Sequence, residues 1–528
     1  MKKFILLGLL VSLTLSFKLK AQLTYKDVAG IFYARCTSCH HAGANHYSYQ
    51  NYAGVFANRN LIQNDLNINK MPPWKADTTY SRFEHERLIS AQEKSDILNW
   101  IATGATKGDT TLAPAEPVYP PKYQLVGNAD LSLTIPTFSS FASTQDIYVC
   151  FSLPTNLTQT RIVRAYEVVP GDATIVHHAV ITADSTGMST SDLSGACINQ
   201  PGNIGLGTYA PGSKAKIFPS QAPLKLGVTL KAGSNVIMQI HYPKGTYGKA
   251  DSTKIRLYFY PPGETGVREL YMTTPLQNWS MSIPANTTRT FTATYPTAPA
   301  TFTSAVSLYG VFPHSHVIAQ GMLLYAVNPG IDTIPLIRIN DWDFNWQDFY
   351  IYKNLLKLPI GYRIFAQHIY NNTTSNLNNP HNPPIAVNAG LSTTDEMLFD
   401  GIMATDYQTG DELIDMQAIV DADTLYATGV KQNYLSTINI RAQAYPNPFT
   451  NEVKIKYLIG ESMPINIEIT DVLGKTILSQ SEGKKDAGMN EFNWSGKNKN
   501  GQAVPNGIYF YNIKAGNHSF KDKIIKQD

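Results

Sequence analysis

The sequence predicts a multidomain, mostly β protein that carries one small helical domain near its N-terminus. The chain has 528 residues, which exceeds the size of an ordinary single domain. From residue 125 onward, short runs rich in Val, Ile, Tyr, Phe and Thr alternate with Gly, Pro and Asn turns, a spacing typical of β-sandwiches. Helical periodicity is clearest in residues 22–112. Aromatic residues make up 11% of the chain and charged residues 16%, which favours an exported β-rich protein.

The N-terminus has the pattern of a secretory signal peptide. Lys2 and Lys3 precede an apolar run from Phe4 to Phe17. This run is shorter than the about 20 residues that span a bilayer, and no later run is long enough. We expect residues 1–21 to be removed after Ala21 and the mature chain to lack a transmembrane segment; an uncleaved N-terminal anchor is the alternative. The net charge of +3 gives no indication of nucleic-acid binding.

The four cysteines divide into two pairs. Cys36 and Cys39 lie in one local motif, and this leaves Cys150 and Cys197. Because export permits disulfides, the second pair can form one bridge. Two buried free thiols are the alternative.

The stretch "ARCTSCHHAG" contains the haem-attachment motif C-x-x-C-H. Cys36 and Cys39 would form thioethers with one haem c, and the adjacent His40 would ligate its iron. A thioredoxin-like dithiol is the alternative, but it requires a preceding strand in a βαβ unit. Here "YKDVAGIFYAR" instead places Val28 and Phe32 on one face of a helix.

A second helix is predicted in "SAQEKSDILNWIATG". Ser90 and Glu93 have the spacing of a capping box, and Gly104 can end the helix. Residues 113–124 are rich in Pro and lack periodicity, so we expect a semi-rigid linker there.

The sixth ligand of a haem iron is usually Met or His. Met71 lies in the Pro-rich "NKMPPWKAD", where the loop would hold a thioether at fixed geometry. The competitors are His41, His46 and His85, which we interpret as loop histidines. With C-x-x-C-H early and M-P later, residues 22–112 resemble a class I cytochrome c, which implies a small all-α haem domain.

Strands are expected between residues 125 and 432, and several of them carry histidines. Examples are "DIYVCFSL", "NVIMQIHY", "KIRLYFYP", "TFTATYP" and "YRIFAQHIY". His314 and His316 form an H-x-H pair, and on a strand such residues face one side and can chelate one metal. His177 and His178 are adjacent, so they can share a metal only if the strand bends or bulges, or if they use different ring nitrogens. His241 ends another strand.

Five segments, in order, resemble the copper type II, ascorbate-dependent monooxygenases, the family of peptidylglycine α-hydroxylating monooxygenase and dopamine β-monooxygenase. They are "IYVCFSLP", "TIVHHAVI", "GTYAPGSKAKIFP…NVIMQIHY", "YGVFPHSHVIAQGM" and "STTDEMLF". The resemblance implies two all-β jelly-roll or sandwich copper lobes, residues 125–265 and 266–432.

The same resemblance implies two mononuclear copper sites. One copper would be held by His177, His178 and His241. The other, at which dioxygen is activated, would be held by His314, His316 and Met397. A thioether favours Cu(I) and is rare at zinc, so Met397 argues for copper. A core Met is the alternative for Met397, and we interpret His368 as structural.

The family hydroxylates C–H bonds with O2, and ascorbate or another reductant supplies the electrons. The peptide-amidating members carry an Arg two residues before H-x-H, where this chain has Phe312 followed by Pro313. Without that carboxylate clamp we do not predict peptide amidation. The substrate is expected to be a small-molecule or peptide-like organic compound. The aromatic insert at 339–352 is interpreted either as lining a cleft or as a packed sandwich edge.

Residues 440–528 predict a further β unit. "AYPNPF", "DVLGK" and "GIYFY" resemble pieces of the type IX secretion C-terminal sorting domain, which implies an Ig-like sandwich, the type IX secretion machinery as a partner, and a secreted or cell-surface location. An adhesion-type sandwich that stays attached is the alternative.

For the whole chain the sequence predicts a haem- and copper-containing monooxygenase, with haem c as a further electron donor. A copper- and haem-containing electron-transfer or copper-binding surface protein without hydroxylase activity is the alternative. An adhesive surface protein with decayed sites is a third hypothesis, which the intact ligand sets disfavour.

Overall fold

The computed structural model describes most of the chain, namely residues 22–42, 47–119, 124–197, 202–210, 213–425, 441–459, 463–486, 488–515 and 518–527. The chain divides into two compact units, Met1–Leu425 and Tyr426–Asp528. The expected signal peptide, residues 1–21, and His46 lie outside the described residues. Among the helices that the structure describes, none has both the length and the apolar character that crossing a membrane requires.

The N-terminal part of the first unit is helical. Its elements are α1 (Tyr25–Arg35), α2 (Tyr52–Ala57), α3 (Arg59–Asn67), α4 (Ala91–Ala102) and the 3₁₀ turn η1 (Thr110–Leu112). Val28 and Phe32 of α1 are fully buried beside Trp100 of α4, which confirms the predicted helix face. The Ser90–Glu93 capping box is also confirmed, because the Ser90 hydroxyl accepts from the Glu93 amide and the Glu93 carboxylate accepts from the Ser90 amide.

The strands of the N-terminal lobe pair antiparallel, in keeping with its alternating apolar patterns, except that β13 runs parallel to β9. One sheet has the order β1-β12-β4-β9-β13, with β7 paired to β4 and β8 to β9. A second sheet has the order β3-β10-β5-β6, and β2 pairs with β11. The bounds are β1 (Leu131–Thr134), β2 (Phe138–Ser139), β3 (Ile147–Pro154), β4 (Arg161–Val169), β5 (His178–Asp184), β6 (Ile204–Tyr209), β7 (Lys216–Ile217), β8 (Ser220–Gln221), β9 (Leu224–Leu230), β10 (Asn235–Tyr242), β11 (Ala250–Asp251), β12 (Lys254–Phe259) and β13 (Arg268–Glu269).

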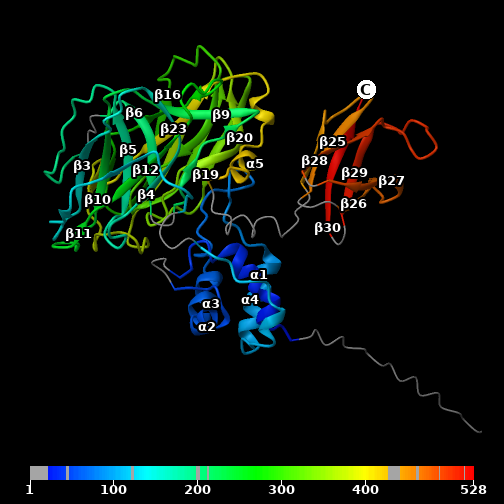
Figure 1. The fold of residues 1–528 in the computed structure, drawn as a ribbon, viewed down its shortest axis with the longest axis horizontal. Coiled ribbons are helices and arrows are strands. Elements are labelled where there is room, and N and C mark those ends of the chain that lie inside the picture. The colour runs from blue at the N-terminus through cyan, green and yellow to red at the C-terminus, as the bar shows by residue number, and fades with distance from the viewer. Residues whose placement is uncertain are drawn as a thin grey trace, which may run out of the picture. The chain divides into compact units, whose positions relative to one another are not determined.

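The C-terminal lobe has two four-stranded sheets, β14-β23-β17-β20 and β16-β21-β18-β19, and the pair β15-β22. The bounds are β14 (Tyr271–Gln277), β15 (Ser282–Ile283), β16 (Thr287–Tyr295), β17 (Val306–Phe312), β18 (Ala319–Asn328), β19 (Asp332–Ile339), β20 (Tyr350–Leu358), β21 (Arg363–Asn372), β22 (Val387–Asn388), β23 (Phe399–Asp406), η2 (Asp411–Leu413) and α5 (Met416–Asp421). Figure 1 shows the strands of both lobes in layers, with α5 beside β20.

The two lobes share one apolar core. Phe218 of the first lobe packs edge-to-face on Tyr309 of the second, and buried side chains from both lobes belong to the same cluster. The layered sheets of both lobes confirm the predicted β-sandwich character of this region. Because the core is continuous, the lobes hold their facing sides in a fixed relation.

The second unit is a separate two-sheet β domain with its own apolar core. Its sheets are β24-β25-β28 and β27-β26-β29-β30. The bounds are β24 (Arg441–Tyr445), β25 (Val453–Ile459), β26 (Met463–Asp471), β27 (Thr476–Lys485), β28 (Gly488–Trp494), β29 (Gly507–Ala515) and β30 (His518–Lys526).

Candidate metal centres

The first candidate centre is built by two neighbouring strands of the N-terminal lobe. His178 opens β5 and lies directly opposite His241 of β10, so both side chains lie on one face of the sheet. His177 precedes the strand, after a turn in which the amides of Ile175 and Val176 donate to the Asp172 carbonyl. The strand alternation that would point His177 and His178 to opposite faces therefore does not apply. The expectation that both lie within a strand was wrong, and the turn is the physical reason.

The three imidazoles meet through their Nδ1 atoms. The Nδ1 of His178 lies 3.1 Å from that of His177 and 3.4 Å from that of His241. The three residues can each offer one ligand atom within 4.8 Å of the others. First-row metals bind imidazole nitrogen at about 2 Å, which sets neighbouring nitrogens about 3 Å apart. The spacing thus fits a single metal ion.

Two residues lie next to the ring of His241 in this centre. The Asp146 carboxylate lies 3.5 Å from His241 Nε2, and its other oxygen accepts from the Lys244 amide at 2.8 Å. Tyr148 stacks on the same ring, with centroids 4.4 Å apart. His241 Nε2 has no hydrogen-bond partner among the described residues, so Asp146 acts on this ring as a nearby acidic group, while Nδ1 faces the other two histidines.

Burial keeps the imidazoles of His177 and His178 neutral, which is the form that binds a metal. Burial, aided by the neighbouring His241, lowers the pKa of His177 to about 4. Burial also lowers the pKa of His178 well below its ordinary value, and both neighbouring histidines add to the effect.

The second candidate centre lies just beyond the end of β17. β17 pairs with β23 so that Phe312 opposes Gly401. Beyond the strand ends the Phe399 amide donates to the His314 carbonyl at 3.2 Å, so the H-x-H segment stays beside the segment that carries Met397. The ring centroids of His314 and His316 are 5.4 Å apart. The H-x-H pair was expected on a strand but follows one, where the neighbouring backbone still fixes it.

Hydrogen bonds select the ring nitrogen that each histidine of this second set presents. The His314 Nδ1 lies 2.7 Å from Gln347 Oε1, and the His316 Nδ1 lies 3.1 Å from the Asp395 carbonyl. Both partners are acceptors, so each Nδ1 carries the proton and each Nε2 keeps a free lone pair. Burial lowers the pKa of His314 to about 3 and that of His316 to about 4. Met397 is also buried.

A buried carboxyl group fixes the backbone of this centre. The Glu396 side chain accepts from the amides of His316 at 2.9 Å, Ile318 at 2.7 Å and Met397 at 3.2 Å. Burial raises the pKa of Glu396 to about 8, against the lowering effect of these amides. One side chain thereby ties the H-x-H segment to the Met397 segment.

His368 lies behind the same centre in a structural arrangement. Its Nδ1 contacts Ser315 Oγ at 2.8 Å, and its Nε2 contacts Asp400 Oδ2 at 3.0 Å. The Ser315 hydroxyl donates to the Met397 carbonyl at 2.6 Å, and Asp400 accepts from the His314 amide at 3.1 Å. Protein groups engage both ring nitrogens, and the network holds the segments that carry the ligands.

The two candidate centres, called donor sets here, face each other at short range. The first donor set is His177, His178 and His241, and the second is His314, His316 and Met397. The ring centroids of His178 and His314 are 6.4 Å apart. Phe344 stacks on His177 at 5.3 Å and meets the edge of His316 at 5.8 Å, so it joins the two sets. Phe344 belongs to the aromatic insert, which therefore contacts both sets of histidines. Nothing in the local sequence predicts this proximity, because it depends on how the lobes pack.

The C-x-x-C-H motif forms a turn at the end of α1. The amides of Cys39 and His40 both donate to the Cys36 carbonyl, at 3.1 and 2.9 Å. The His40 Nδ1 lies 3.1 Å from the Tyr47 carbonyl, the kind of bond that assigns Nε2 as a metal-binding atom. Burial raises the pKa of Cys36 to about 12, which disfavours a reactive thioredoxin-like thiolate.

The remaining haem-ligand candidates lie in different surroundings. Met71 is half-buried in the turn after α3, where its amide donates to the Asp65 carbonyl at 3.3 Å. His85 Nε2 contacts Asp421 of α5 at 2.7 Å, and His41 stacks on Tyr119. His85 therefore belongs to a contact between the helical part and the C-terminal lobe.

Cys150 and Cys197 are joined by a disulfide, which confirms the predicted bridge. Cys150 lies in β3, the strand next to β10. The side-chain amide of Gln239 in β10 donates to the Cys197 carbonyl at 2.7 Å. The bridge thus supports the sheet that carries His241.

Sequence reasoning missed the supporting residues Asp146, Gln347 and Glu396. Glu396 lies in the quoted "STTDEMLF", so its position next to a ligand was available as a signal. Asp146 and Gln347 carry no local signal, because each acts on a histidine from a distant part of the chain.

Two family models match the chain. Residues 264–428 match the copper type II ascorbate-dependent monooxygenase, C-terminal domain, and residues 443–527 match the secretion system C-terminal sorting domain. The first match covers the lobe that holds His314, His316 and Met397. No curated protein matches the chain.

Solved structures resemble the chain only weakly. PorZ, a surface component of the type IX secretion system of Porphyromonas gingivalis, is 19% identical over 16% of this chain and 11% of its own, with a TM-score of 0.14. Latent PorU from the same organism is 11% identical over 72% of this chain and 34% of its own, with a TM-score of 0.16. VP2 of infectious bursal disease virus is 13% identical over 56% and 76%, with a TM-score of 0.17. The chain spans about a tenth and a third of the two bacterial proteins, and at these scores the likenesses carry no argument.

The family matches and the histidine geometry agree on two points. A domain similar to the copper type II monooxygenase C-terminal domain occupies residues 264–428 and implies copper. A sorting domain of the secretion system occupies residues 443–527, which indicates export to the cell surface or secretion.

Proposed function

We propose that this protein is an exported copper monooxygenase that hydroxylates a C–H bond of an organic substrate with O2. The observation that carries the proposal is the pair of facing histidine groups: three Nδ1 atoms close together in one lobe, and in the other the neighbouring rings of His314 and His316, whose segment Glu396 links to Met397. The chemistry of the donors fits copper, because imidazole suits both oxidation states and a thioether favours Cu(I). His177, His178 and His241 would hold one copper, and His314, His316 and Met397 the other.

Copper bound at these residues would supply the redox chemistry that activates O2. One oxygen atom enters the substrate as a hydroxyl group and the other leaves as water, which consumes two protons and two electrons from ascorbate or another reductant. The residues of the chain keep the imidazoles neutral, fix their ring nitrogens and exclude water from His314 and His316, which are 8% and 1% exposed. Two sites that each store one electron suit this two-electron demand.

The surroundings of the second donor set indicate an apolar reacting group. Phe312 stacks on His314 at 5.9 Å, and Phe399 meets the edge of the same ring at 6.4 Å. The cationic clamp for a carboxylate is replaced by Phe312. We therefore propose an organic substrate that presents an apolar C–H group and does not depend on a carboxylate next to it.

The helical part is proposed to carry one covalent haem c. Cys36 and Cys39 would form the thioethers, His40 would bind the iron and Met71 is the candidate for the sixth ligand. The bond from His40 Nδ1 to the Tyr47 carbonyl fits this assignment. A haem in this place would supply a one-electron store on the same chain as the copper ligands.

The alternative is an electron-transfer or copper-binding surface protein without hydroxylase activity. The close approach of the two donor sets, with Phe344 against both, favours it, since little space separates the histidines. The two functions differ in whether oxygen uptake requires an organic substrate.

Metal content tests the proposal first. The mature chain, made with haem maturation and loaded with copper before dialysis, should contain one iron and two coppers by elemental mass spectrometry. The variant His177→Ala/His178→Ala should lose one copper. Met397→Ile should abolish product formation and leave haem reduction intact. Iron without firmly held copper would reject the monooxygenase.

A further inference from the structure

The segment between α3 and α4 leaves the helical core and docks on the C-terminal lobe. We call residues 74–87 the docking segment. Ala76 forms a β-bridge with Ile339, the residue that ends β19, and Phe83 forms one with Tyr352 in β20. Ala76 and Phe83 are both buried in the apolar cluster of the lobes rather than in that of the helices. This segment is therefore part of the lobe in packing, although it belongs to the helical part in sequence.

Backbone hydrogen bonds attach the docking segment at both ends of one loop. The Asp77 amide donates to the Arg338 carbonyl at 2.8 Å, just before the loop. The Glu84 amide donates to the Ile351 carbonyl at 2.8 Å, just after it. The loop between these points, residues 340–349, joins β19 to β20 and is called the aromatic loop here.

Charged side chains of the docking segment hold the aromatic loop at its two ends. Lys75 pairs with Asp341 at 3.0 Å at the start of the loop. Near its end, Arg87 forms a half-buried ion pair with Asp348. Arg338 pairs with Asp77 at 2.7 Å directly before the loop. Since half-buried pairs are screened less than exposed ones, the Arg87–Asp348 pair is the stronger constraint.

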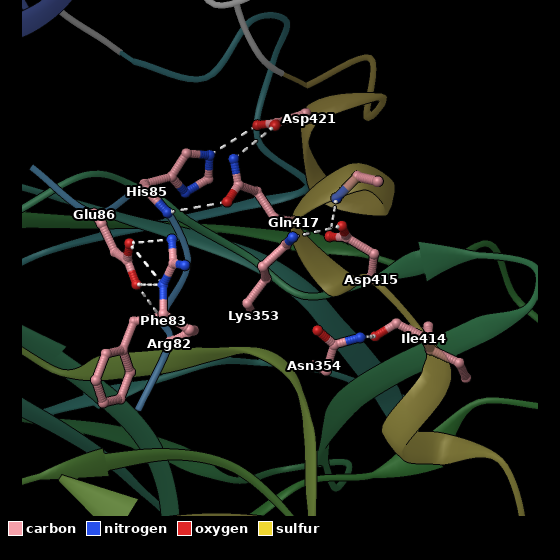
Figure 2. Close-up of polar contacts among 11 residues, drawn as sticks. Arg82, Phe83, His85, Glu86, Lys353, Asn354, Ile414, Asp415, Gln417 and Asp421 are labelled. Carbon is pink, nitrogen blue, oxygen red and sulfur yellow. Dashed lines mark hydrogen bonds and ion pairs between the residues drawn. The ribbon is translucent and has the colours of Figure 1, made fainter. Parts of the chain in front are cut away.

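A further set of contacts anchors the docking segment itself, as Figure 2 shows. His85 Nε2 contacts Asp421 of α5 at 2.7 Å, and the His85 amide faces the Gln417 side chain at 3.4 Å. The Lys353 amide of β20 donates to the Arg82 carbonyl at 3.1 Å. The docking segment is thus fixed to α5 and β20 by contacts other than those it makes with the aromatic loop.

The aromatic loop contacts the histidines of both donor sets. The Trp342 indole donates to the His316 carbonyl at 3.0 Å, and the Gln347 side chain accepts from His314 Nδ1 at 2.7 Å. Phe344 packs on the rings of His177 and His316. Side chains that bond or pack against ligand histidines set ring orientation and metal affinity.

We propose that the docking segment positions the metal-binding histidines by holding the aromatic loop against them. The helical part is then a support of the copper centre and not only a separate redox module. The inference rests on the proposed function in so far as these histidines bind copper. Arg87 and Asp77 are positioning residues, since they act on His314 and His316 through Gln347 and Trp342.

The test uses the full chain and two variants, Arg87→Gln and Asp77→Asn. Cu(I) affinity at each donor set is measured by competition with a chromogenic chelator, in the presence of the His177→Ala/His178→Ala change for the second set and the His314→Ala/His316→Ala change for the first. We expect each variant to weaken Cu(I) binding at the second set by about tenfold, as supporting residues of metal ligands do. Hydrogen–deuterium exchange of residues 340–349 should become faster.

Arg82→Gln is the matched control. Arg82 lies in the docking segment, but its side chain pairs with Glu86 of the same segment. Arg87→Lys should restore most of the affinity, and Arg87→Asp combined with Asp348→Arg should restore slow exchange in the loop.

Two results would overturn the inference or separate it from the proposed function. If Arg87→Gln and Asp77→Asn match Arg82→Gln in both Cu(I) affinity and exchange, the docking segment does not position the histidines. If the wild-type chain binds no copper, the proposed function fails, and the exchange of residues 340–349 still decides whether the docking segment holds the loop.

Discussion

His178 and His314 come from different lobes, yet their ring centroids lie 6.4 Å apart. His178 lies opposite His241 on one face of its sheet, and the ring of His314 lies 5.4 Å from that of His316. The two donor sets therefore form one histidine-rich zone between the lobes. The shared apolar core of the lobes keeps this zone together.

Two Cu(II) ions held by these sets should influence each other magnetically. We expect the electron paramagnetic resonance spectrum of the fully loaded chain to be broadened relative to the sum of the single-site spectra. The single-site references are His177→Ala/His178→Ala and His314→Ala/His316→Ala. A spectrum equal to the sum would show that the donor sets separate in solution.

Asp146→Asn should weaken copper binding at the first donor set. The carboxylate is an acidic group 3.5 Å from His241 Nε2, and loss of such a group beside a ligand lowers metal affinity by about tenfold or more. Affinity at the second set should stay unchanged, as measured by chelator competition. Asp192→Asn is the control, because Asp192 caps an exposed turn through the Ser194 amide. Equal affinities in the two variants would contradict the role of Asp146.

Copper should stay bound at pH values where an ordinary histidine loses it. Protons and metal compete for the same nitrogen, so affinity falls as pH falls through the histidine pKa. Burial lowers the pKa of His314 to about 3 and that of His316 to about 4, so at the second donor set protons compete only near these values. A titration from pH 7 to pH 3, followed by the Cu(II) spectrum, should show release below about pH 5. A midpoint near the ordinary value, about 6.5, would contradict the expectation.

Glu84→Gln should stabilise the first unit at alkaline pH. Burial raises the pKa of Glu84 from 4.5 to about 8, and one of its carboxyl oxygens is buried without a hydrogen-bond partner among the described residues. Between these two values the folded chain keeps a proton that the unfolded chain releases, so the free energy of unfolding falls as pH rises. Gln stays neutral, and the difference between pKa 4.5 and about 8 corresponds to a gain of about 5 kcal/mol near pH 9 and none near pH 4.

Thermal unfolding of the Glu84→Gln chain at the two pH values checks this expectation. A gain of this size should raise Tm by a few degrees near pH 9. Glu412→Gln is the control, because Glu412 is exposed. A stabilisation that is the same at both pH values would show that the carboxyl group does not titrate as stated.

Local patterns predicted the elements of the fold well. The capping box at Ser90 and Glu93, the face of α1 and the strands that end in His241 or contain His368 follow from periodicity and turn chemistry. Those patterns depend on neighbours in sequence, which is why they can be read without a structure.

The sequence predicted which residues are candidate ligands, because His and Met are recognisable by residue type. It did not predict how these residues come together, because that depends on turns and on contacts between distant segments. His177 can join His178 because the turn at Asp172 places it before the strand. The segments of Met397 and His316 lie together because the Glu396 side chain accepts from the amides of both. The role of Gln347 depends on the docking of a loop, so no local pattern contains it.

The contacts of the docking segment also determine the order in which parts of the first unit can fold. Asp77 is separated from Arg338 by 261 positions and His85 from Asp421 by 336, so these contacts form only after nearly the whole first unit has been synthesised. Contacts over such separations form late, since a long loop must close first. During synthesis Ala76 and Phe83 are made long before their partners Ile339 and Tyr352. The first domain to be made is therefore among the last to be completed, and a chain cut after residue 112 would leave an apolar segment uncovered.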